Sequence, residues 1–583
     1  MENIYAKRIE EIRKLGFDAV IIKGTDPHSS EYPADRWKQV QWVSGFTGEA
    51  GDIVVTADHA GLWTDTRYFI QANAQLKGTG IELHKTRVPG EVGIPQWLKS
   101  HFPDRRPRVA VDGLCQSIGD IRSLSFCEII DCPDLLSQLW ADRPAIPHTP
   151  VEVLNEKTVG MSRHEKISRL RSQLEAKGCK GILIGSLDEI AWLLNVRGED
   201  IDYNPYVISY LIVTTKRTVW FVRNVDEVPQ IEGVVKAGYG SLADGIEDLK
   251  GCGRIMIDPS TVNFSVYKTL KSALGEDNLK FEKSPVAPYK AVKNEKEIEG
   301  FRKAFLEDGI AMENFLYWLE NEVASGSKIT EWDASVRLTE LRSRIKGYRG
   351  NSFGNISAYG PNAALPHYST PVENSDLIRK KGLYLVDSGG HYEYGTTDIT
   401  RTVPMGRCTR SEKEDYTLVL KGMIDLSMAV FPEGTAGCQI DALARRPLWE
   451  AKKNFGHGTG HGIGFFSGVH EGPQDIRQNF NPMPLLPGMV TSNEPGLYRE
   501  GKYGIRHENV LLCREHGKSE YGRFFSFETL TLCHIDRGAI IRRLLSKEER
   551  RWLNAYNRTV RKKLSPHLES EVAKWLRKKT RRI

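Results

Sequence analysis

Hydrophobic and polar residues alternate at helical spacing at the start of the chain. Residues 4–15 place isoleucine and leucine at intervals of three to five positions among charged residues, and Gly16 follows as a stop signal. The apolar run 19–22 comes next and is typical of a buried strand. A helix that leads into a buried strand predicts an α/β domain at the N-terminus.

The same pattern returns 162 residues later. A charged helical stretch ends at Gly178 and is followed by the apolar run 181–184. We therefore predict two related α/β domains, over residues 1–150 and 155–295. The alternative is chance, because units of helix, stop and strand recur in any α/β protein.

Residues 296–583 form a third predicted domain. Gly326 stands seven positions before Asp333, and Gly434 stands seven positions before Asp441, each at the end of a long helical stretch. A helix-turn-helix unit used twice predicts internal pseudo-symmetry, with the natural site between the two halves.

Composition and charge narrow the class of protein. A chain of 583 residues with 40% hydrophobic and 27% charged residues can build about two to four domains. The net charge of +6 is concentrated at the end: residues 536–583 carry 16 Lys and Arg against 5 Asp and Glu, which leaves −5 for the rest. A net charge of +6 is small for a nucleic-acid-binding protein of this length, so we do not expect nucleic acid as a partner. We interpret the basic tail as a solvated helix end with a frayed terminus, with a targeting or nucleic-acid role as the alternative.

Cysteine usage and hydropathy indicate the compartment. The nine cysteines are scattered, without a CxxC pair, which predicts reduced thiols in a cytoplasmic protein. The charged N-terminus lacks the apolar core of a signal peptide, and no stretch approaches the ~18 apolar residues of a membrane span. We therefore expect no membrane partner.

Two aspartates in the third domain stand where burial is costly. Asp387 ends the apolar run 383–386, and Asp398 follows eleven positions later. A buried carboxylate needs a cation or several hydrogen-bond donors. A turn or capping role is the alternative for either residue alone.

Histidines and glutamates join them further along. His457 and His461 lie in a stretch with five glycines in nine residues, which excludes a helix and therefore the helical histidine pair of HExxH zinc proteases. Glu494 precedes a proline, and Glu508 interrupts a strand pattern. One imidazole with four carboxylates is an oxygen-rich donor set, better suited to a pair of Mn²⁺-like ions than to a cysteine-based zinc site.

Six motifs carry a resemblance to a known family. They are Val386-Asp-Ser-Gly-Gly390, Thr397-Asp-Ile-Thr-Arg401, His457-Gly-Thr-Gly-His-Gly-Ile-Gly464, Val469-His-Glu-Gly-Pro473, Asn493-Glu-Pro-Gly496 and Gly504-Ile-Arg-His-Glu-Asn509. With residues 44–48 and 64–69, they make essentially the whole chain resemble the pita-bread metallopeptidases, most closely the aminopeptidase P family in its long three-domain form. The resemblance implies two creatinase-like α/β domains followed by a pita-bread α+β domain.

The resemblance also implies a dinuclear metal centre. Its ligands would be Asp387, Asp398, His461, Glu494 and Glu508. Asp398 and Glu508 would bridge two divalent ions, with Mn²⁺ expected and Zn²⁺ or Co²⁺ as alternatives.

Further residues gain roles from the same resemblance. Glu494 would accept the proton of the attacking water, while His367 and His470 would contact the substrate around the scissile bond and stabilise the oxyanion. His457 resembles a pocket histidine, and His461 would also face the substrate.

Arg67 of the first domain resembles a residue that closes over the peptide, and Arg506 would hold a ligand carboxylate. His507 departs from the family pattern, in which an aliphatic residue often precedes this glutamate. Alternation along a strand would turn its ring to the opposite face, so we do not expect it to bind metal.

The implied activity is removal of the N-terminal residue from peptides with proline second, by a water that bridges the two metals, in a homodimer. The nearest alternative is an Xaa-Pro dipeptidase, which shares the five ligands but is disfavoured by the chain length and the additional domain. A catalytically silent pita-bread binding module is the alternative from another class, and creatinase-type enzymes lack this ligand set.

Overall fold

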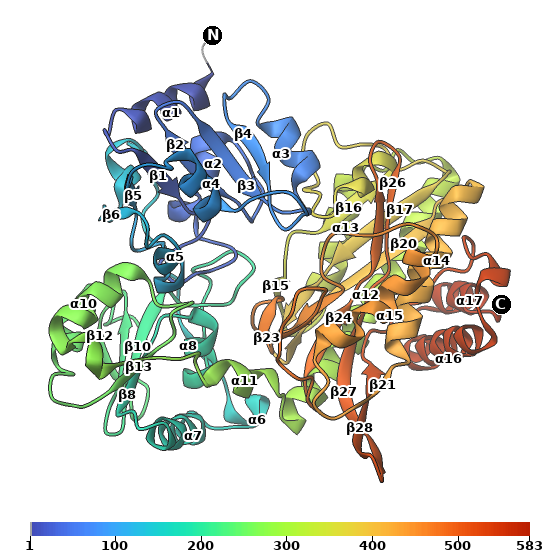
Figure 1. The fold of residues 1–583 in the computed structure, drawn as a ribbon. Coiled ribbons are helices and arrows are strands. Elements are labelled where there is room, and N and C mark those ends of the chain that lie inside the picture. Colours follow the sequence, from blue (N-terminus) through green and yellow to red (C-terminus); the bar gives the residue numbers. More distant parts are fainter. Residues whose placement is uncertain (1–2) are drawn as a thin grey trace. The chain divides into compact units, whose positions relative to one another are not determined.

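The computed structural model describes residues 3–583, and the chain forms two compact units (Figure 1). The first unit runs to residue 286, and the second runs from residue 287 to the end and includes the short segment 157–160. Across the described residues, none of the helices is both long and apolar enough to cross a membrane.

The first unit begins with a six-stranded sheet in the order β4-β3-β2-β1-β5-β6. Its strands are β1 (Ala19–Ile22), β2 (Asp52–Thr56), β3 (Ala60–Thr64), β4 (Glu82–Lys85), β5 (Arg108–Val111) and β6 (Glu128–Asp131). Its helices are α1 (Ile4–Arg13), α2 (Gln39–Ser44), α3 (Phe69–Gln75), α4 (Ile94–His101) and α5 (Ile118–Ser123). The predicted helix and strand at the N-terminus are therefore confirmed.

A second six-stranded sheet of the same unit has the equivalent order, β12-β11-β10-β8-β13-β14. Its strands are β8 (Gly181–Ile184), β10 (Ser209–Thr214), β11 (Thr218–Val222), β12 (Val235–Gly238), β13 (Ile255–Ile257) and β14 (Leu279–Phe281). The helices around it are α7 (Arg163–Ala176), α8 (Leu187–Leu194), α9 (Leu242–Glu247) and α10 (Phe264–Leu274).

The two sheets also share their strand directions. In each, the first strand pairs antiparallel with the second and parallel with the fifth, and the second pairs antiparallel with the third. The outer pairs are parallel in both sheets. This repeated topology confirms the prediction of two related α/β domains.

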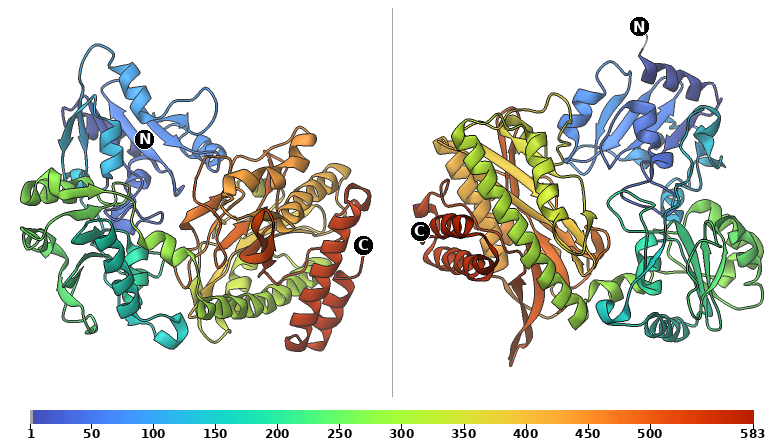
Figure 2. Two further views of the ribbon diagram at one scale, coloured as in Figure 1. Left: turned by 60° about the horizontal axis from the view of Figure 1, so that its bottom comes forward. Right: turned by 180° about the vertical axis from the view of Figure 1, so that it is seen from behind.

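Two pairs of helices frame the second unit. They are α12 (Glu295–Ser325) with α13 (Glu331–Ser343), and α14 (Arg410–Ser427) with α15 (Gly437–Glu450). Gly326 ends α12 at a φ of +92°, and Gly434 turns the chain before α15 at a φ of +88°, both in the left-handed region that favours glycine. The right-hand view of Figure 2 shows α12 and α13 covering one face of the strands.

Each helix pair has its own sheet. The first is β16-β17-β20 and the second is β21-β28-β27-β24-β22-β23, with a separate ribbon β25-β26. The bounds are β16 (Ile356–Tyr359), β17 (Leu383–Ser388), β20 (Ile399–Pro404), β21 (Val430–Pro432), β22 (Gly460–Gly462), β23 (Glu471–Ile476), β24 (Val490–Asn493), β25 (Gly496–Arg499), β26 (Tyr503–Arg506), β27 (Asn509–Ser519) and β28 (Gly522–Thr529).

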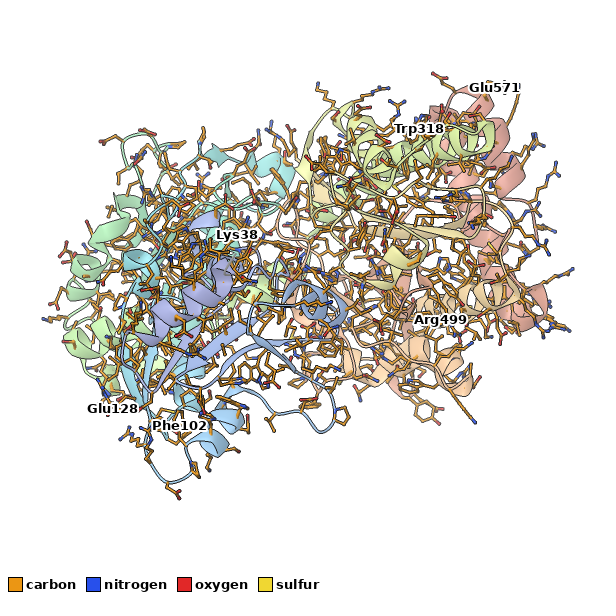
Figure 3. All side chains as sticks on the ribbon, turned by 90° about the horizontal axis from the view of Figure 1, so that it is seen from above. Lys38, Phe102, Glu128, Trp318, Arg499 and Glu571 are labelled. Atoms are coloured by element: carbon orange, nitrogen blue, oxygen red, sulfur yellow. The ribbon has the colours of Figure 1, made fainter. Side chains whose placement is uncertain are left out.

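The basic tail forms two further helices, α16 (Lys547–Leu564) and α17 (Ser570–Lys579). Leu553, Val560 and Leu576 are buried in the core of the second unit, and the backbone N–H of Ile583 donates to Asn554 Oδ1 at 3.1 Å. Figure 3 shows Glu571 of α17 on the same side of this unit as Trp318 of α12. The expectation of a frayed terminus is wrong, because an apolar stripe anchors these basic helices.

Candidate metal centre

The first two predicted ligands come from neighbouring strands of the small sheet. All six residues of β17 are buried, including Asp387, and Asp398 immediately precedes β20. The antiparallel register of β17 and β20 pairs Asp387 with Thr400. Gly389 permits the close approach of the two segments, because a Cβ there would lie 2.0 Å from the carbonyl oxygen of Thr397.

The other three predicted ligands come from the larger sheet. His461 lies on β22, Glu494 follows β24, and Glu508 precedes β27, and these three strands are neighbours. Thr400 of β20 ties the two sheets together, because its Oγ1 donates to Glu508 Oε2 at 3.0 Å. The two halves of the second unit thus meet at this group of residues.

The donor atoms converge. Nε2 of His461 lies 3.2 Å from Glu494 Oε1 and 3.5 Å from Asp398 Oδ2. The ligand atoms of Asp398, His461 and Glu508 all lie within 4.8 Å of one another. Nδ1 of His461 is 3.0 Å from the carbonyl oxygen of Gly462, which can only accept, so Nδ1 carries a proton and Nε2 is the nitrogen that faces the carboxylates.

Two buried carboxylate oxygens fit a cation particularly well. Across residues 3–583, Oδ1 of Asp387 and Oε1 of Glu508 find no hydrogen-bond donor. An unpaired buried acceptor of this kind is costly, and a metal ion relieves that cost. The residues present therefore fit divalent metal ions, with four carboxylates and one imidazole converging on one place.

Electrostatics leads to the same conclusion. Burial and the neighbouring acids raise the pKa of Asp398 well above its ordinary value and that of Glu508 to about 8. Burial opposes the ionisation of Glu494 as well, but hydrogen bonding and charge from His461 lower its pKa to about 2. Buried acids this close together ionise jointly only when cations neutralise them.

Arg506 orients the predicted ligand Asp387 through hydrogen bonds. Its Nε donates to Asp387 Oδ2 at 3.1 Å, its Nη2 donates to the same oxygen, and its Nη1 donates to the hydroxyl of Tyr498 at 2.6 Å. The Tyr498 hydroxyl in turn lies 2.7 Å from Nε2 of His457. Burial lowers the pKa of His457 to about 4, so its imidazole is neutral, and its Nε2 accepts a hydrogen bond from the Tyr498 hydroxyl.

The two histidines predicted to meet the substrate lie on separate loops. The ring of His470 stands 4.3 Å from that of His461, at 90° to it, so His470 borders the metal centre. His367 is half-buried in the segment that follows residues 360–364. Residues 360–364, just before this segment, pack closely on β26, since a Cβ on Gly504 would lie 1.6 Å from the carbonyl oxygen of Ala363.

Two further residues that the sequence analysis singled out have partners other than the predicted metal ligands. Arg67 belongs to the first unit, where its Nε and Nη2 donate to the two oxygens of Asp65 at 2.9 and 2.8 Å. His507 is fully buried, with its ring 4.3 Å from that of Tyr416 on α14 and nearly perpendicular to it.

Sequence reasoning missed two supporting residues. Arg401 is fully buried and donates to the backbone carbonyl of Glu508 and to Asn509 Oδ1. Its place three residues after Asp398 in a recognised motif was the available signal. Tyr498 had no such signal, because its contacts with His457 and Arg506 depend on the fold of the β25-β26 ribbon.

Comparison with known proteins defines the class. The profile of metallopeptidase family M24 matches residues 299–515, and that of the C-terminal region of this family matches residues 523–583. The creatinase/prolidase N-terminal domain matches twice, over residues 6–139 and 142–297. The fold is therefore that of an M24 metallopeptidase with two N-terminal domains.

Relatives of similar length define the family. A probable Xaa-Pro aminopeptidase P of Laccaria bicolor is 36% identical over 98% of this chain and 92% of its own length. Aminopeptidase P2 of Arabidopsis thaliana is 37% identical over 99% of this chain and 88% of its own length. This chain belongs to the Xaa-Pro aminopeptidase P family.

Solved structures agree with this assignment. The X-prolyl aminopeptidase of Caenorhabditis elegans, described as a cytosolic enzyme with a di-nuclear active site, has a TM-score of 0.95 at 33% identity and covers 99% of this chain and 100% of its own. An Xaa-Pro dipeptidase of Bacillus anthracis has a TM-score of 0.52 at 25% identity and covers 64% of this chain and 99% of its own. The longer architecture is thus shared with the aminopeptidase.

Proposed function

We propose that this protein is a metal-dependent aminopeptidase that hydrolyses the first peptide bond of substrates with proline in the second position. The observation that carries the proposal is the convergence of Asp398, His461 and Glu508 within 4.8 Å, beside buried carboxylate oxygens that lack donors. The full-length similarity to Xaa-Pro aminopeptidases supports the choice of substrate.

Asp387, Asp398, His461, Glu494 and Glu508 would hold two divalent ions, with Asp398 and Glu508 shared between them. When bound, such ions lower the pKa of a water and polarise a carbonyl group. We propose Mn²⁺, because four of the five donors are carboxylates, with Zn²⁺ and Co²⁺ as alternatives.

The side chains of the chain itself supply the proton transfers. Glu494 is ionised at neutral pH and accepts the proton of the attacking water. His470, beside His461, donates a hydrogen bond to the oxyanion that develops on the scissile carbonyl, and we assign a contact with the substrate to His367 as well. Neutral His457 is held by Tyr498 and keeps the pocket wall in place.

Acceptance of proline in the second position follows from the chemistry of the substrate. The peptide nitrogen of proline carries no hydrogen and its ring bends the chain, so a pocket that offers no acceptor there tolerates proline at no cost. The contact of Arg67 with the peptide, which the family resemblance implies, stays a prediction. The ion pair of Arg67 with Asp65 holds the guanidinium in a fixed orientation.

The test compares three peptides with the Mn²⁺-loaded enzyme. Release of alanine from Ala-Pro-Ala, with Ala-Ala-Ala cleaved poorly, is the expected result. Cleavage restricted to the dipeptide Ala-Pro would make the protein a prolidase instead. Failure to cleave any of the three, with both metals bound, would favour a binding module.

We also propose a cytoplasmic homodimer. All nine cysteines are free thiols in the structure, which suits a reducing compartment, and the C. elegans relative is described as cytosolic. Sedimentation at several protein concentrations tests the dimer, and a monomer at all of them would refute it.

A further inference from the structure

A pair of histidines stands together in the first unit, outside the metal centre. His59 precedes β3 and His84 lies on β4, and their Nε2 atoms are 3.0 Å apart. Glu82 lies two positions before His84 on the same strand and therefore on the same face of the sheet. Its Oε2 is 3.7 Å from Nδ1 of His59, and the ligand atoms of the three residues all lie within 4.8 Å of one another.

A glycine creates the space for this pair. Gly61 of β3 lies opposite Glu82 in the parallel register of β3 and β4. A Cβ on Gly61 would lie 2.6 Å from Cδ2 of His84 and 2.7 Å from Nε2 of His59. The two imidazoles therefore occupy the volume that a side chain would fill at any other residue type.

Tryptophans fix the orientation of both rings. Trp63 stacks on His84 with centroids 3.9 Å apart and planes within 4°, and Trp97 of α4 lies 4.8 Å from His59. Ring orientation fixed in advance is what a metal site requires of its ligands.

We propose that His59, His84 and Glu82 bind a Zn²⁺-class transition-metal ion, independently of the M24 centre. Tetrahedral zinc with Zn–N bonds of about 2.0–2.1 Å separates two ligand nitrogens by about 3.4 Å, so the pair needs to open by only a few tenths of an ångström. Glu82 is 69% exposed, which leaves its carboxylate free to turn towards the ion and leaves a fourth position for water. Imidazole ligands prefer zinc, nickel and copper, whereas the carboxylate-rich M24 centre suits harder ions.

The test is a zinc titration of the Mn²⁺-loaded full-length enzyme, followed by gel filtration and elemental analysis. The M24 centre is common to all variants, so the difference between them reports on the new site alone. We expect His84→Gln to bind one zinc fewer per chain than the wild type. Glu82→Gln, which changes an exposed residue, should weaken this zinc site at least about tenfold.

His101→Gln is the matched control. Its ring stacks on the same Trp97 at 4.6 Å, but its Nε2 faces Asp58 at 3.2 Å. We expect this variant to keep the zinc content of the wild type.

If His84→Gln fails to fold by circular dichroism, Glu82→Gln decides the question. Equal zinc content and affinity in the wild type and in both ligand variants would overturn the proposal and leave the pair as a simple hydrogen bond.

Discussion

Arg506 donates two hydrogen bonds to one oxygen of Asp387, which leaves the other oxygen of that carboxylate for a cation. Arg506 lies on β26 and Asp387 on β17, so the arginine holds a ligand that comes from a different strand pair. The strength of metal binding should therefore depend on a residue that touches no metal.

Arg506→Lys keeps the charge but removes the forked geometry. We expect the Mn²⁺ concentration for half-maximal activity to rise by about 10- to 100-fold. The matched control is Arg499→Lys, whose arginine lies on the neighbouring strand β25, is labelled in Figure 3, and pairs with Asp415 on α14 at 2.6 Å. An equal Mn²⁺ requirement in the two variants would contradict the role given to Arg506.

Tyr498→Phe tests the link between Arg506 and His457. The variant loses two hydrogen bonds and little volume, and we expect kcat/KM to fall by about tenfold, which corresponds to about 1–2 kcal/mol. The Mn²⁺ requirement should change less than in Arg506→Lys. A fall in kcat/KM that added Mn²⁺ reverses would show that Tyr498 acts on metal binding instead.

Gly389→Ala tests the close approach of the segments that carry Asp387 and Asp398. A Cβ at position 389 meets the carbonyl oxygen of Thr397 at 2.0 Å, so we expect a loss of stability above about 2 kcal/mol together with loss of metal. Gly240→Ala is the control, because a Cβ there meets no atom of the described chain within 4 Å. Thermal unfolding and metal content measure both effects, and wild-type values for Gly389→Ala would be inconsistent with this packing.

His534 makes the stability of the second unit depend on pH. Its Nδ1 lies 2.8 Å from Glu313 Oε2, and although burial opposes the charge, Glu313 and Asp536 raise the pKa of His534 to about 9. A raised pKa contributes stability that is fully present below the unfolded value of about 6.5 and is lost as the pH rises through about 9. The contribution is at most about 3 kcal/mol.

We therefore expect the melting temperature of the wild type to fall more between pH 6.5 and pH 9.5 than that of His534→Gln. His516→Gln, which changes an exposed histidine on β27, should behave like the wild type. Parallel pH curves for the wild type and His534→Gln would rule out this contribution.

Features that depend on local pattern were predictable from the sequence. The helix and strand of each N-terminal domain follow from residue spacing, and the repeat at an offset of 162 predicted two related α/β domains, whose sheets share one strand order in the structure. The apolar stripe of α16, Leu553 and Val560, was overlooked because the surrounding basic residues dominate the composition of the tail.

Features that depend on strand register were not predictable. His59 and His84 meet only because β3 and β4 pair in parallel with Gly61 between the two rings. The contact of Tyr498 with His457 likewise joins residues 41 positions apart, through the β25-β26 ribbon. Motif residues identify candidate ligands, whereas their supporting partners emerge only from the folded chain.

The central claim is that the carboxylates around His461 bind the metals that make this chain a peptidase. The most direct test measures, on the same preparations, the Mn²⁺ content and the release of alanine from Ala-Pro-Ala by the wild type and by Asp398→Asn. For the wild type we predict two Mn²⁺ ions per chain and rapid release of alanine. For Asp398→Asn we predict loss of the bound Mn²⁺ and of alanine release, with an unchanged circular dichroism spectrum. Hydrolysis by Asp398→Asn at the rate of the wild type would contradict the account.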